Sequence, residues 1–148
     1  MKRIYKYCIL IVLLFLSNVL RAQSDLEIRK VFDEYGKKRG VVMVELNGKM
    51  ADDYDFKIFK SIIINDIAGA GDFIRKCLLK DEAGAKKVKQ VVSNGKLTSI
   101  ILQLNPINNV SRIILFNESA EKTTKSTLIY IESEKNADDV LKLVLKKR

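Results

Sequence analysis

The most constraining feature of this sequence is a block of three β-rich segments between Leu97 and Glu132. Short turns rich in Asn, Pro, Ser and Lys separate the segments, which are Leu97–Leu104 (LTSIILQL), Val110–Phe116 (VSRIILF) and Ser126–Glu132 (STLIYIE). β-Branched and aromatic residues favour strands, and turns this short join antiparallel neighbours. We therefore predict three consecutive antiparallel strands, against which the rest of the chain packs.

Helices are predicted on both sides of this block. Ser24 and Glu27 form a capping box, in which each side chain satisfies a free amide at a helix start, and an apolar face with helical spacing continues to Tyr35. Beyond the block, Asn136 can cap a helix that has an apolar stripe, acidic residues in its first turn and basic residues in its last. The helix dipole favours that distribution of charge.

Two further strands are predicted before the block. Val41–Leu46 is rich in valine and precedes Asn47-Gly48, a strong tight-turn signal. Phe56–Ile67 is a second β-rich run, most convincing at its centre. Between them, Lys49–Asp55 is polar and acidic, so we expect a loop or a single helical turn there.

The segment that leads into the block is ambiguous. Asp72 can cap a helix whose apolar residues fall on one face. Ala85–Ser93 fits a helix that turns into a strand, the interpretation we favour, but it also fits a strand that pairs across Asn94-Gly95. Together the elements predict an α+β fold, with a mainly antiparallel sheet of about five strands packed in two layers against three or four helices.

The N-terminus indicates export. Met1–Tyr7 carries three basic residues and no acidic residue, the unbroken apolar run Cys8–Leu16 follows, and Ala22 is a small residue where cleavage is expected. These features are typical of a secretory signal peptide, whereas a membrane-spanning helix needs roughly 20 apolar residues. We predict a signal peptide at residues 1–22 and one domain at residues 23–148, periplasmic or secreted. An uncleaved membrane anchor is the alternative.

Part of the positive charge belongs to this leader. The chain has 27 basic and 18 acidic residues, and loss of the four basic residues in the leader lowers the net charge from +9 to +5. The remaining basic groups lie at Lys37–Arg39, Lys86–Lys89 and Lys146–Arg148, without the interleaved aromatic residues on which bases stack. We therefore expect no nucleic-acid partner, and no membrane span once the leader is cleaved.

A resemblance appears at the end of the block. The strand Thr127–Glu132 (TLIYIE) leads into NADDVLKLVL, and NGKLTSIILQL precedes it. This arrangement resembles the small exported domains of unknown function common in gut Bacteroidetes, in particular the domain-of-unknown-function class numbered 4252 or a close relative. In that class a strand similar to Leu128–Ile131 is followed by an acidic cap and a terminal amphipathic helix. The resemblance implies export and an α+β fold, but it implies no functional residue.

Few residues point to catalysis. The chain contains no histidine, which removes Ser–His and Cys–His dyads and His-based metal sites. Cys77 shares a predicted helix face with apolar residues, so we interpret it as a buried thiol, and it has no partner for an intramolecular disulfide once Cys8 is removed. Gly69-Ala70-Gly71 lacks the third glycine of a dinucleotide-binding turn, and Asp72 would repel a phosphate there.

We expect a non-enzymatic binding or interaction module, with a protein or an envelope component as its partner. No catalytic, cofactor-binding or metal-binding residue is predicted. The alternative is a carboxylate-dependent, hydrolase-like enzyme with a site near Asp52-Asp55, where Asp52, Asp53 and Asp55 form the tightest acidic cluster. Their spacing does not match a calcium-binding loop. Any function is expected either there or on the polar edge of the strand block, at Ser99, Gln103 and Arg112.

Overall fold

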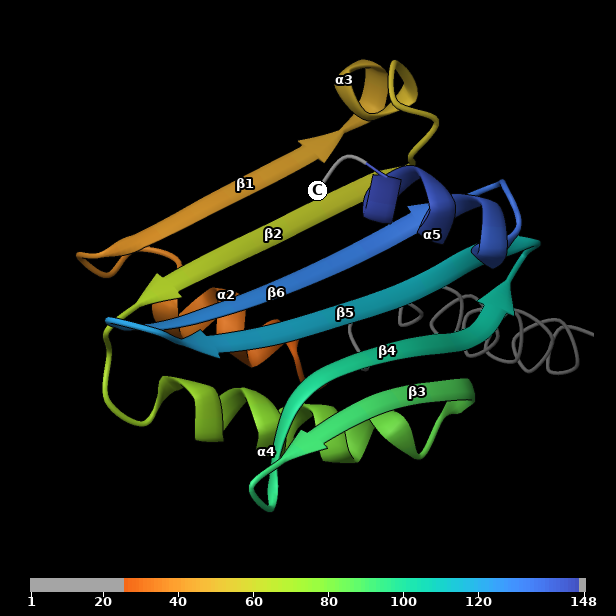
Figure 1. Cartoon of the computed structure of the whole chain (residues 1–148). Coiled ribbons are helices and arrows are strands. Elements are labelled where there is room, and N and C mark those ends of the chain that lie inside the picture. The colour runs from red at the N-terminus through yellow and green to blue at the C-terminus, as the bar shows by residue number, and fades with distance from the viewer. Residues whose placement is uncertain (1–25, 147–148) are drawn as a thin grey trace, which may run out of the picture.

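Six antiparallel strands form one sheet, and helices lie on both of its faces (Figure 1). The structure is a computed structural model, and it describes residues 26–146. In chain order the elements are α2 (Arg29–Tyr35), β1 (Val41–Asn47), α3 (Gly48–Asp52), β2 (Ile58–Asn65), α4 (Ala70–Glu82), β3 (Ala85–Ser93), β4 (Lys96–Ile107), β5 (Val110–Ala120), β6 (Thr124–Ser133) and α5 (Ala137–Lys146).

The sheet has the strand order β1-β2-β6-β5-β4-β3. Helix α4 carries the chain from β2 to β3 at the opposite edge, and four consecutive strands then return to pair with β2. Two of the connections are tight turns, at Asn94-Gly95 and Asn108-Asn109, and all four residues have positive φ, between 51° and 72°. Two-residue hairpin turns of type I′ require this conformation, which glycine and asparagine tolerate.

The predicted fold class is confirmed. The three β-rich segments are the strands β4, β5 and β6, each longer than predicted because pairing continues into the turns. The two predicted earlier strands are β1 and β2, and the segment between them contains the one-turn helix α3. The predicted signal peptide at residues 1–22 lies outside the described residues.

The sixth strand comes from the ambiguous segment. The preferred interpretation of Ala85–Ser93 as a helix turning into a strand is wrong, because the whole segment is β3 and pairs with β4 across Asn94-Gly95. All of β3 after its first residue is exposed. Backbone pairing rather than burial therefore defines this strand, and a method that looks for a buried face finds little signal in it.

Two other local predictions need correction. Asp72 lies in the first turn of α4 and does not cap it, since the cap position is Gly69, in a left-handed conformation with φ of 79°. Asn47-Gly48 does not form a hairpin turn, because Gly48 begins α3 directly after β1, with φ of 55°. Both glycines supply a positive φ that lets a helix start abruptly after a loop or strand.

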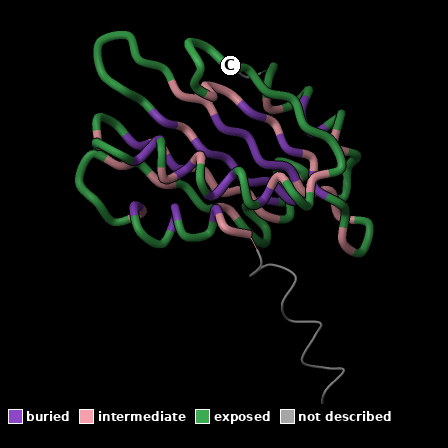
Figure 2. The backbone as a smooth tube through the Cα atoms, turned by 90° about the horizontal axis from the view of Figure 1, so that it is seen from below, coloured by how far each residue is buried: buried purple, intermediate pink, exposed green. Residues whose placement is uncertain are grey.

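The main core lies between the sheet and the helices α2 and α4. Strand alternation directs every second residue of the sheet toward these helices, so that residues such as Ile62, Leu102, Ile114 and Leu128 are completely buried there. Figure 2 shows the buried positions along the central strands and the exposed positions along the loops. Helix α2 also forms one wall of the cleft described below.

A smaller core lies on the opposite face, beneath α5. Val140 and Leu141 of α5 pack on Ile113 and Ile131 of the sheet. The predicted cap is confirmed, since the Asn136 Oδ1 accepts a hydrogen bond from the Asp139 N–H at 2.9 Å. Among the described residues, no helix is both long and apolar enough to cross a membrane.

Candidate functional site

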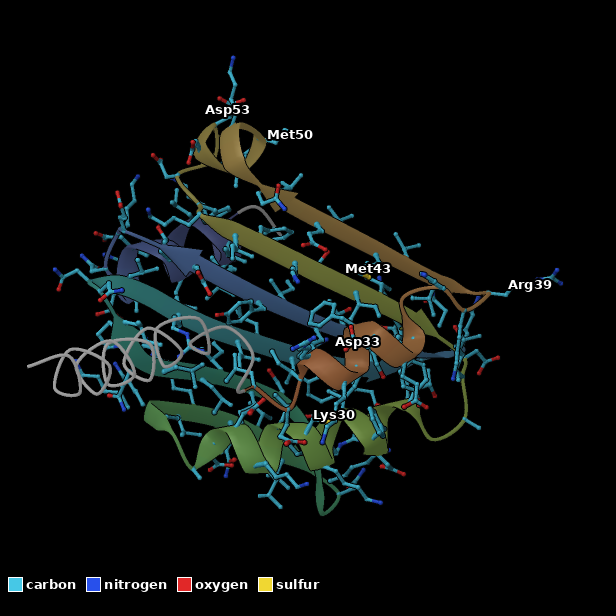
Figure 3. The ribbon with its side chains drawn as sticks, turned by 180° about the vertical axis from the view of Figure 1, so that it is seen from behind. Lys30, Asp33, Arg39, Met43, Met50 and Asp53 are labelled. Atoms are coloured by element: carbon cyan, nitrogen blue, oxygen red, sulfur yellow. The ribbon has the colours of Figure 1, made fainter. Side chains whose placement is uncertain are left out.

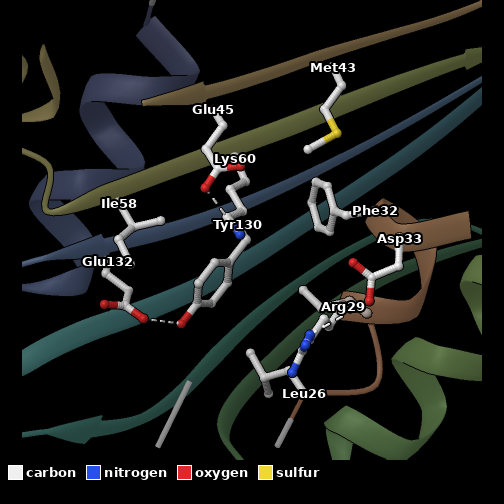
Figure 4. Close-up of a pocket in the computed structure, with 11 residues that line it drawn as sticks. Leu26, Arg29, Phe32, Asp33, Met43, Glu45, Ile58, Lys60, Tyr130 and Glu132 are labelled. Atoms are coloured by element: carbon white, nitrogen blue, oxygen red, sulfur yellow. Dashed lines mark hydrogen bonds and ion pairs between the residues drawn. The ribbon is translucent and has the colours of Figure 1, made fainter. Parts of the chain in front are cut away.

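An open cleft of about 420 Å³ lies between α2 and the strands β1, β2 and β6, and we call it the α2 cleft. Phe32 of α2 and Met43 of β1 give it an apolar wall, while Tyr130 and Glu132 of β6 lie at its floor (Figure 4). Figure 3 shows from behind that α2 stands over this side of the sheet, beside α4. The cleft therefore combines an apolar wall with the charged side chains Arg29, Asp33, Glu45, Lys60 and Glu132.

Strand pairing brings the polar groups of the floor together. Alternation along β6 places Tyr130 and Glu132 on the same face, toward α2. In the register of β5 with β6, Arg112 is directly opposite Glu132, and Ile114 is opposite Tyr130. The three polar side chains consequently lie side by side on two neighbouring strands, which hold them more rigidly than a loop would.

These three side chains form a directed chain of hydrogen bonds. The Arg112 Nε–H donates to the Tyr130 hydroxyl oxygen at 3.2 Å, and the Tyr130 hydroxyl donates to Glu132 Oε1 at 2.5 Å. Burial raises the pKa of Tyr130, and the bond to Glu132 raises it further, against a smaller opposite effect of Arg112. The tyrosine therefore remains protonated and acts as a hydrogen-bond donor.

The second carboxylate oxygen of Glu132 is left unused. Glu132 is only 7% exposed, yet Oε2 has no hydrogen-bond partner among residues 26–146. No buried side-chain oxygen or nitrogen of the described residues lacks a partner, so this oxygen must be reachable by solvent. Glu132 thus presents one free acceptor oxygen at the floor of the cleft.

The charges at the rim of the cleft neutralise one another. Glu45 of β1 pairs with Lys60 of β2 at 3.4 Å, and Asp33 of α2 lies 3.6 Å from Arg29. Glu132 has no such ion pair, because its contact with Arg112 passes through the tyrosine hydroxyl. Arg112 lies directly opposite Glu132 in the sheet, so the negative charge of Glu132 has a cation nearby, and what Glu132 adds to the cleft is its free acceptor oxygen.

A buried carboxylate on α4 fixes the position of α2. Asp81 accepts hydrogen bonds from the backbone N–H groups of Glu27 and Ile28, at 2.8 Å and 3.0 Å. Burial raises the pKa of Asp81, against the two N–H groups, which lower it. The start of this helix is thus held by a residue more than fifty positions away. The predicted capping box at Ser24 and Glu27 is wrong, because the helix begins at Arg29 and the Glu27 N–H that Ser24 would cap donates to Asp81 instead.

The residues predicted as a polar edge do not form one site. Ser99 and Gln103 of β4 are on the face that carries α5, and Gln103 reaches Asp138 at 3.5 Å. Arg112 is on the opposite face, where it lies behind the floor of the α2 cleft, bonded to Tyr130, and lines a separate pocket beside Asp81. Sequence analysis identified Arg112 but missed Tyr130 and Glu132 as its partners, a grouping that the register of β5 with β6 would have indicated.

The predicted acidic cluster lies far from the α2 cleft, near α3. Figure 3 shows Asp53 beyond the end of the sheet, well away from Asp33 and Met43. Asp53 and Asp55 border an apolar groove of about 430 Å³ beneath α5, where Asp55 pairs with Lys135 at 2.8 Å. Within the described part of the chain, no three His, Cys, Asp or Glu side chains are grouped so that they could hold a metal ion.

The glycine-rich turn before α4 accommodates a carboxylate. A Cβ atom on Gly71 would lie 1.9 Å from an oxygen of Glu118, so only glycine fits here without a shift. Glu118 pairs with Arg75 at 2.5 Å and with Lys96 at 3.1 Å. The acid occupies the space that a phosphate would need, which supports the interpretation of this turn as structural. Cys77 is also structural, since it is buried and burial raises the pKa of its thiol.

A protein-family model described as a family of unknown function, DUF6108, matches residues 15–144. The match covers most of the sequence, so the chain belongs to this family. Searches of the curated proteins and of the solved structures find no match.

Proposed function

We propose that this member of the DUF6108 family is an exported binding module that takes up a ligand in the α2 cleft without transforming it. The observation that carries the proposal is the Glu132 carboxylate at the floor of the cleft, which accepts a hydrogen bond through Oε1 and has Oε2 free, opposite the apolar side chains Phe32 and Met43. Ligand sites in proteins typically measure roughly 300–1,000 Å³, and a few placed polar groups in an apolar lining orient the ligand. The α2 cleft, at about 420 Å³, has that size, and its rim charges are paired with each other.

The free acceptor oxygen at the floor selects the ligand. Because the rim charges are paired and Glu132 Oε2 has no partner among the described residues, the cleft favours a molecule with an apolar body and a hydrogen-bond-donating end, such as an ammonium group. The apolar body would lie against Phe32 and Met43, while its donor would reach Glu132 Oε2. A small molecule, or a side chain of a protein or envelope component, could supply such a group.

The state of the floor favours binding over catalysis. Tyr130 keeps its proton, since burial and Glu132 both raise its pKa, so it does not serve as a general base near neutral pH. Its proton is already committed to Glu132, and Arg112 is committed to the tyrosine oxygen. The chain contains no histidine that could complete a proton relay. The hydrogen bonds among Arg112, Tyr130 and Glu132 therefore fix the position of the Glu132 carboxylate, which favours binding of a ligand over proton transfer to it.

A matched pair of probes tests the proposal. We expect hexylamine to shift the NMR signals of residues around the α2 cleft, and hexanoate, with the same apolar chain and the opposite charge, to bind more weakly. Glu132→Gln should reduce the affinity for hexylamine by at least about tenfold, because a hydrogen bond to a charged group contributes about 1.5–3 kcal/mol.

Glu45→Gln serves as the control. Glu45 lines the same cleft but is already neutralised by Lys60, so this variant should bind hexylamine nearly as well as the unaltered protein. Equal losses in the two variants would indicate a diffuse electrostatic effect and would contradict the role of Glu132. Equal binding of hexylamine and hexanoate would also remove the proposal.

Export has its own test. The basic start and the apolar run Cys8–Leu16 support a cleaved leader, so N-terminal sequencing of protein from its native host should begin near Gln23. A start at Met1 in the membrane fraction would instead indicate an anchored protein. This proposal also includes a periplasmic location, an origin in gut Bacteroidetes and a relationship to the domain-of-unknown-function class numbered 4252.

The enzymatic alternative concerns the other end of the molecule. Asp53 and Asp55 border the apolar groove beneath α5, so a substrate held there would lie near two carboxylates. If a hydrolase activity exists, Asp53→Ala and Asp55→Ala should abolish it while Glu132→Gln leaves it unchanged. An activity that depends on Glu132 would move the enzyme hypothesis to the α2 cleft.

A further inference from the structure

The two edges of the sheet are built differently. At one edge, β3 carries Lys86, Lys87 and Lys89, and its register with β4 is broken near both ends. At the other edge, β1 has the sequence VVMVELN, without a basic residue, and pairs with β2 in unbroken register. Lysines and bulges protect a sheet edge from pairing with another strand, and an apolar, regular edge invites it. Only β3 has the protecting features.

The backbone of β1 has a row of bonding groups directed away from the sheet. The Asn65 N–H donates to the Gly40 carbonyl at 3.3 Å, which marks this pair as a hydrogen-bonded one. In an antiparallel ladder such pairs alternate, so Val42 and Val44 bond toward β2. Met43 and Glu45 therefore direct their N–H and C=O groups outward, and no strand among residues 26–146 pairs with them.

The side chains of β1 leave an apolar row on one face. Val42 is 55% exposed and Val44 is 41% exposed, and both are on the face that carries α5. Leu46 continues this row as far as the groove beneath α5, which it lines. Exposed β-branched residues next to unpaired backbone groups are the two components of a strand-pairing surface.

We propose that β1 pairs with β1 of a second copy of this chain, in antiparallel orientation, with the two-fold axis at Val44. In this register Val44 is opposite the partner's Val44, Val42 is opposite the partner's Leu46, and Met43 is opposite the partner's Glu45. The exposed valines of both copies then contact one another in one continuous apolar row across the two sheets. The proposal is independent of what the α2 cleft binds.

Charge selects this register among the neighbouring ones. A shift that centres the axis on Glu45 would place the two Glu45 carboxylates opposite each other, and like charges in that position are destabilising. A shift that centres it on Met43 would leave Leu46 and the end of β1 without partners. In the proposed register Glu45 faces methionine and keeps its ion pair with Lys60. The strand is thus complementary to itself in one alignment.

The mass of the purified protein in solution tests the proposal. We expect sedimentation equilibrium to show a reversible dimer, and Val44→Lys to raise its dissociation constant at least tenfold. Val91→Lys, at a site on β3 that is 58% exposed, is the matched control and should leave the dimer unchanged. Circular dichroism should show that both variants are folded, since neither valine is buried.

A cysteine at the axis tests the register. Val44 would be a non-hydrogen-bonded pair across the axis, with Cα atoms about 4.5 Å apart, a separation that a disulfide can bridge. Val44→Cys should cross-link into a dimer under mild oxidation, whereas Val91→Cys should not. A protein that is monomeric at every concentration would overturn the proposal. A dimer whose dissociation constant is unchanged by Val44→Lys and that does not cross-link through Val44→Cys would also overturn it. The proposal would equally fail if β1 pairs only with a strand of another protein.

Discussion

The two faces of the sheet bury different kinds of side chain. The face beneath α2 and α4 encloses ionisable groups within its apolar layer, namely Asp81, the Arg75–Glu118 pair and the chain from Arg112 to Glu132. The layer beneath α5 is an apolar cluster, and beyond that helix the sheet exposes Val42 and Val44.

This difference separates two tasks. Buried charges cost free energy unless they are paired and hydrogen-bonded. A layer that contains several such groups therefore has fixed side-chain positions and can hold a charged group where a ligand can reach it. The apolar layer beneath α5 has no such fixed polar contacts, but the sheet on this face ends in the exposed strand β1, to which another strand or another copy can be added. This difference is why we propose ligand binding on the first face and association at the margin of the second.

The largest expected effect comes from removing apolar volume on each face. Leu78→Ala, on the inner side of α4 at a completely buried site, should lower the free energy of unfolding by about 3–5 kcal/mol. Leu141→Ala, on the inner side of α5, should cost about 2 kcal/mol, because this shorter helix covers a smaller core and can move to fill the space. Urea denaturation measures both. Equal losses of stability in the two variants would contradict the distinction between the larger core beneath α2 and α4 and the smaller core beneath α5.

The next effect tests the buried charges. Glu118→Gln should cost about 3 kcal/mol, because it leaves Arg75, 13% exposed, without its main partner. Asp72→Asn removes the other carboxylate near Arg75, but that side chain is 70% exposed, so its loss should cost less than about 1 kcal/mol. If both variants lose the same stability, the ion pair contributes no more than a surface contact.

A smaller effect is expected at the start of α5. Asn136→Ala removes the acceptor for the Asp139 N–H and should cost about 1 kcal/mol of stability. Because α5 covers only its own face, amide hydrogen exchange should increase in α5 and leave α2 and α4 unchanged. Faster exchange in all three helices would show that the two layers open together.

The smallest effect distinguishes two carboxylates by pH. Burial tends to raise the pKa of Glu118, but hydrogen bonds from Arg75, Lys96 and Ser126 outweigh it and hold the pKa below 4.5, the ordinary value for Glu. The stability from Glu118 is therefore present above pH 4.5 and is lost as the pH falls through the lowered pKa. Asp81 has a raised pKa, so its contribution is present below pH 3.8 and is lost as the pH rises through the raised value.

Urea denaturation between about pH 3 and pH 7 should resolve these opposite slopes. Glu118→Gln should flatten the rise of stability with pH on the acid side. Asp81→Asn should steepen the rise of stability with pH above pH 3.8, because the stability that ionisation of Asp81 would remove is no longer lost. Identical slopes in the two variants would contradict the difference in their surroundings.

Sequence analysis predicted much of the fold but little of the site. The strands β4 to β6 and the helix α5 were predictable because β-branched runs, turn residues and the Asn136 cap are local signals. The segment that became β3 was not, because its lysines and valines form no buried face and its structure depends on pairing with β4. The polar edge was misassigned for the same reason, since register decides which of its residues meet.

The sequence by itself determined the fold class, most of the elements and the absence of histidine chemistry. Spacing and composition act over a few residues, and these properties depend on nothing further. Only the tertiary structure decided that Arg112, Tyr130 and Glu132 form one chain, that Asp81 caps a helix far away in sequence, and that β1 lies at an unprotected edge. The first and the last depend on strand register and strand order, and the second depends on the packing of α4 against α2. All three arise from contacts between distant segments and not from any local pattern.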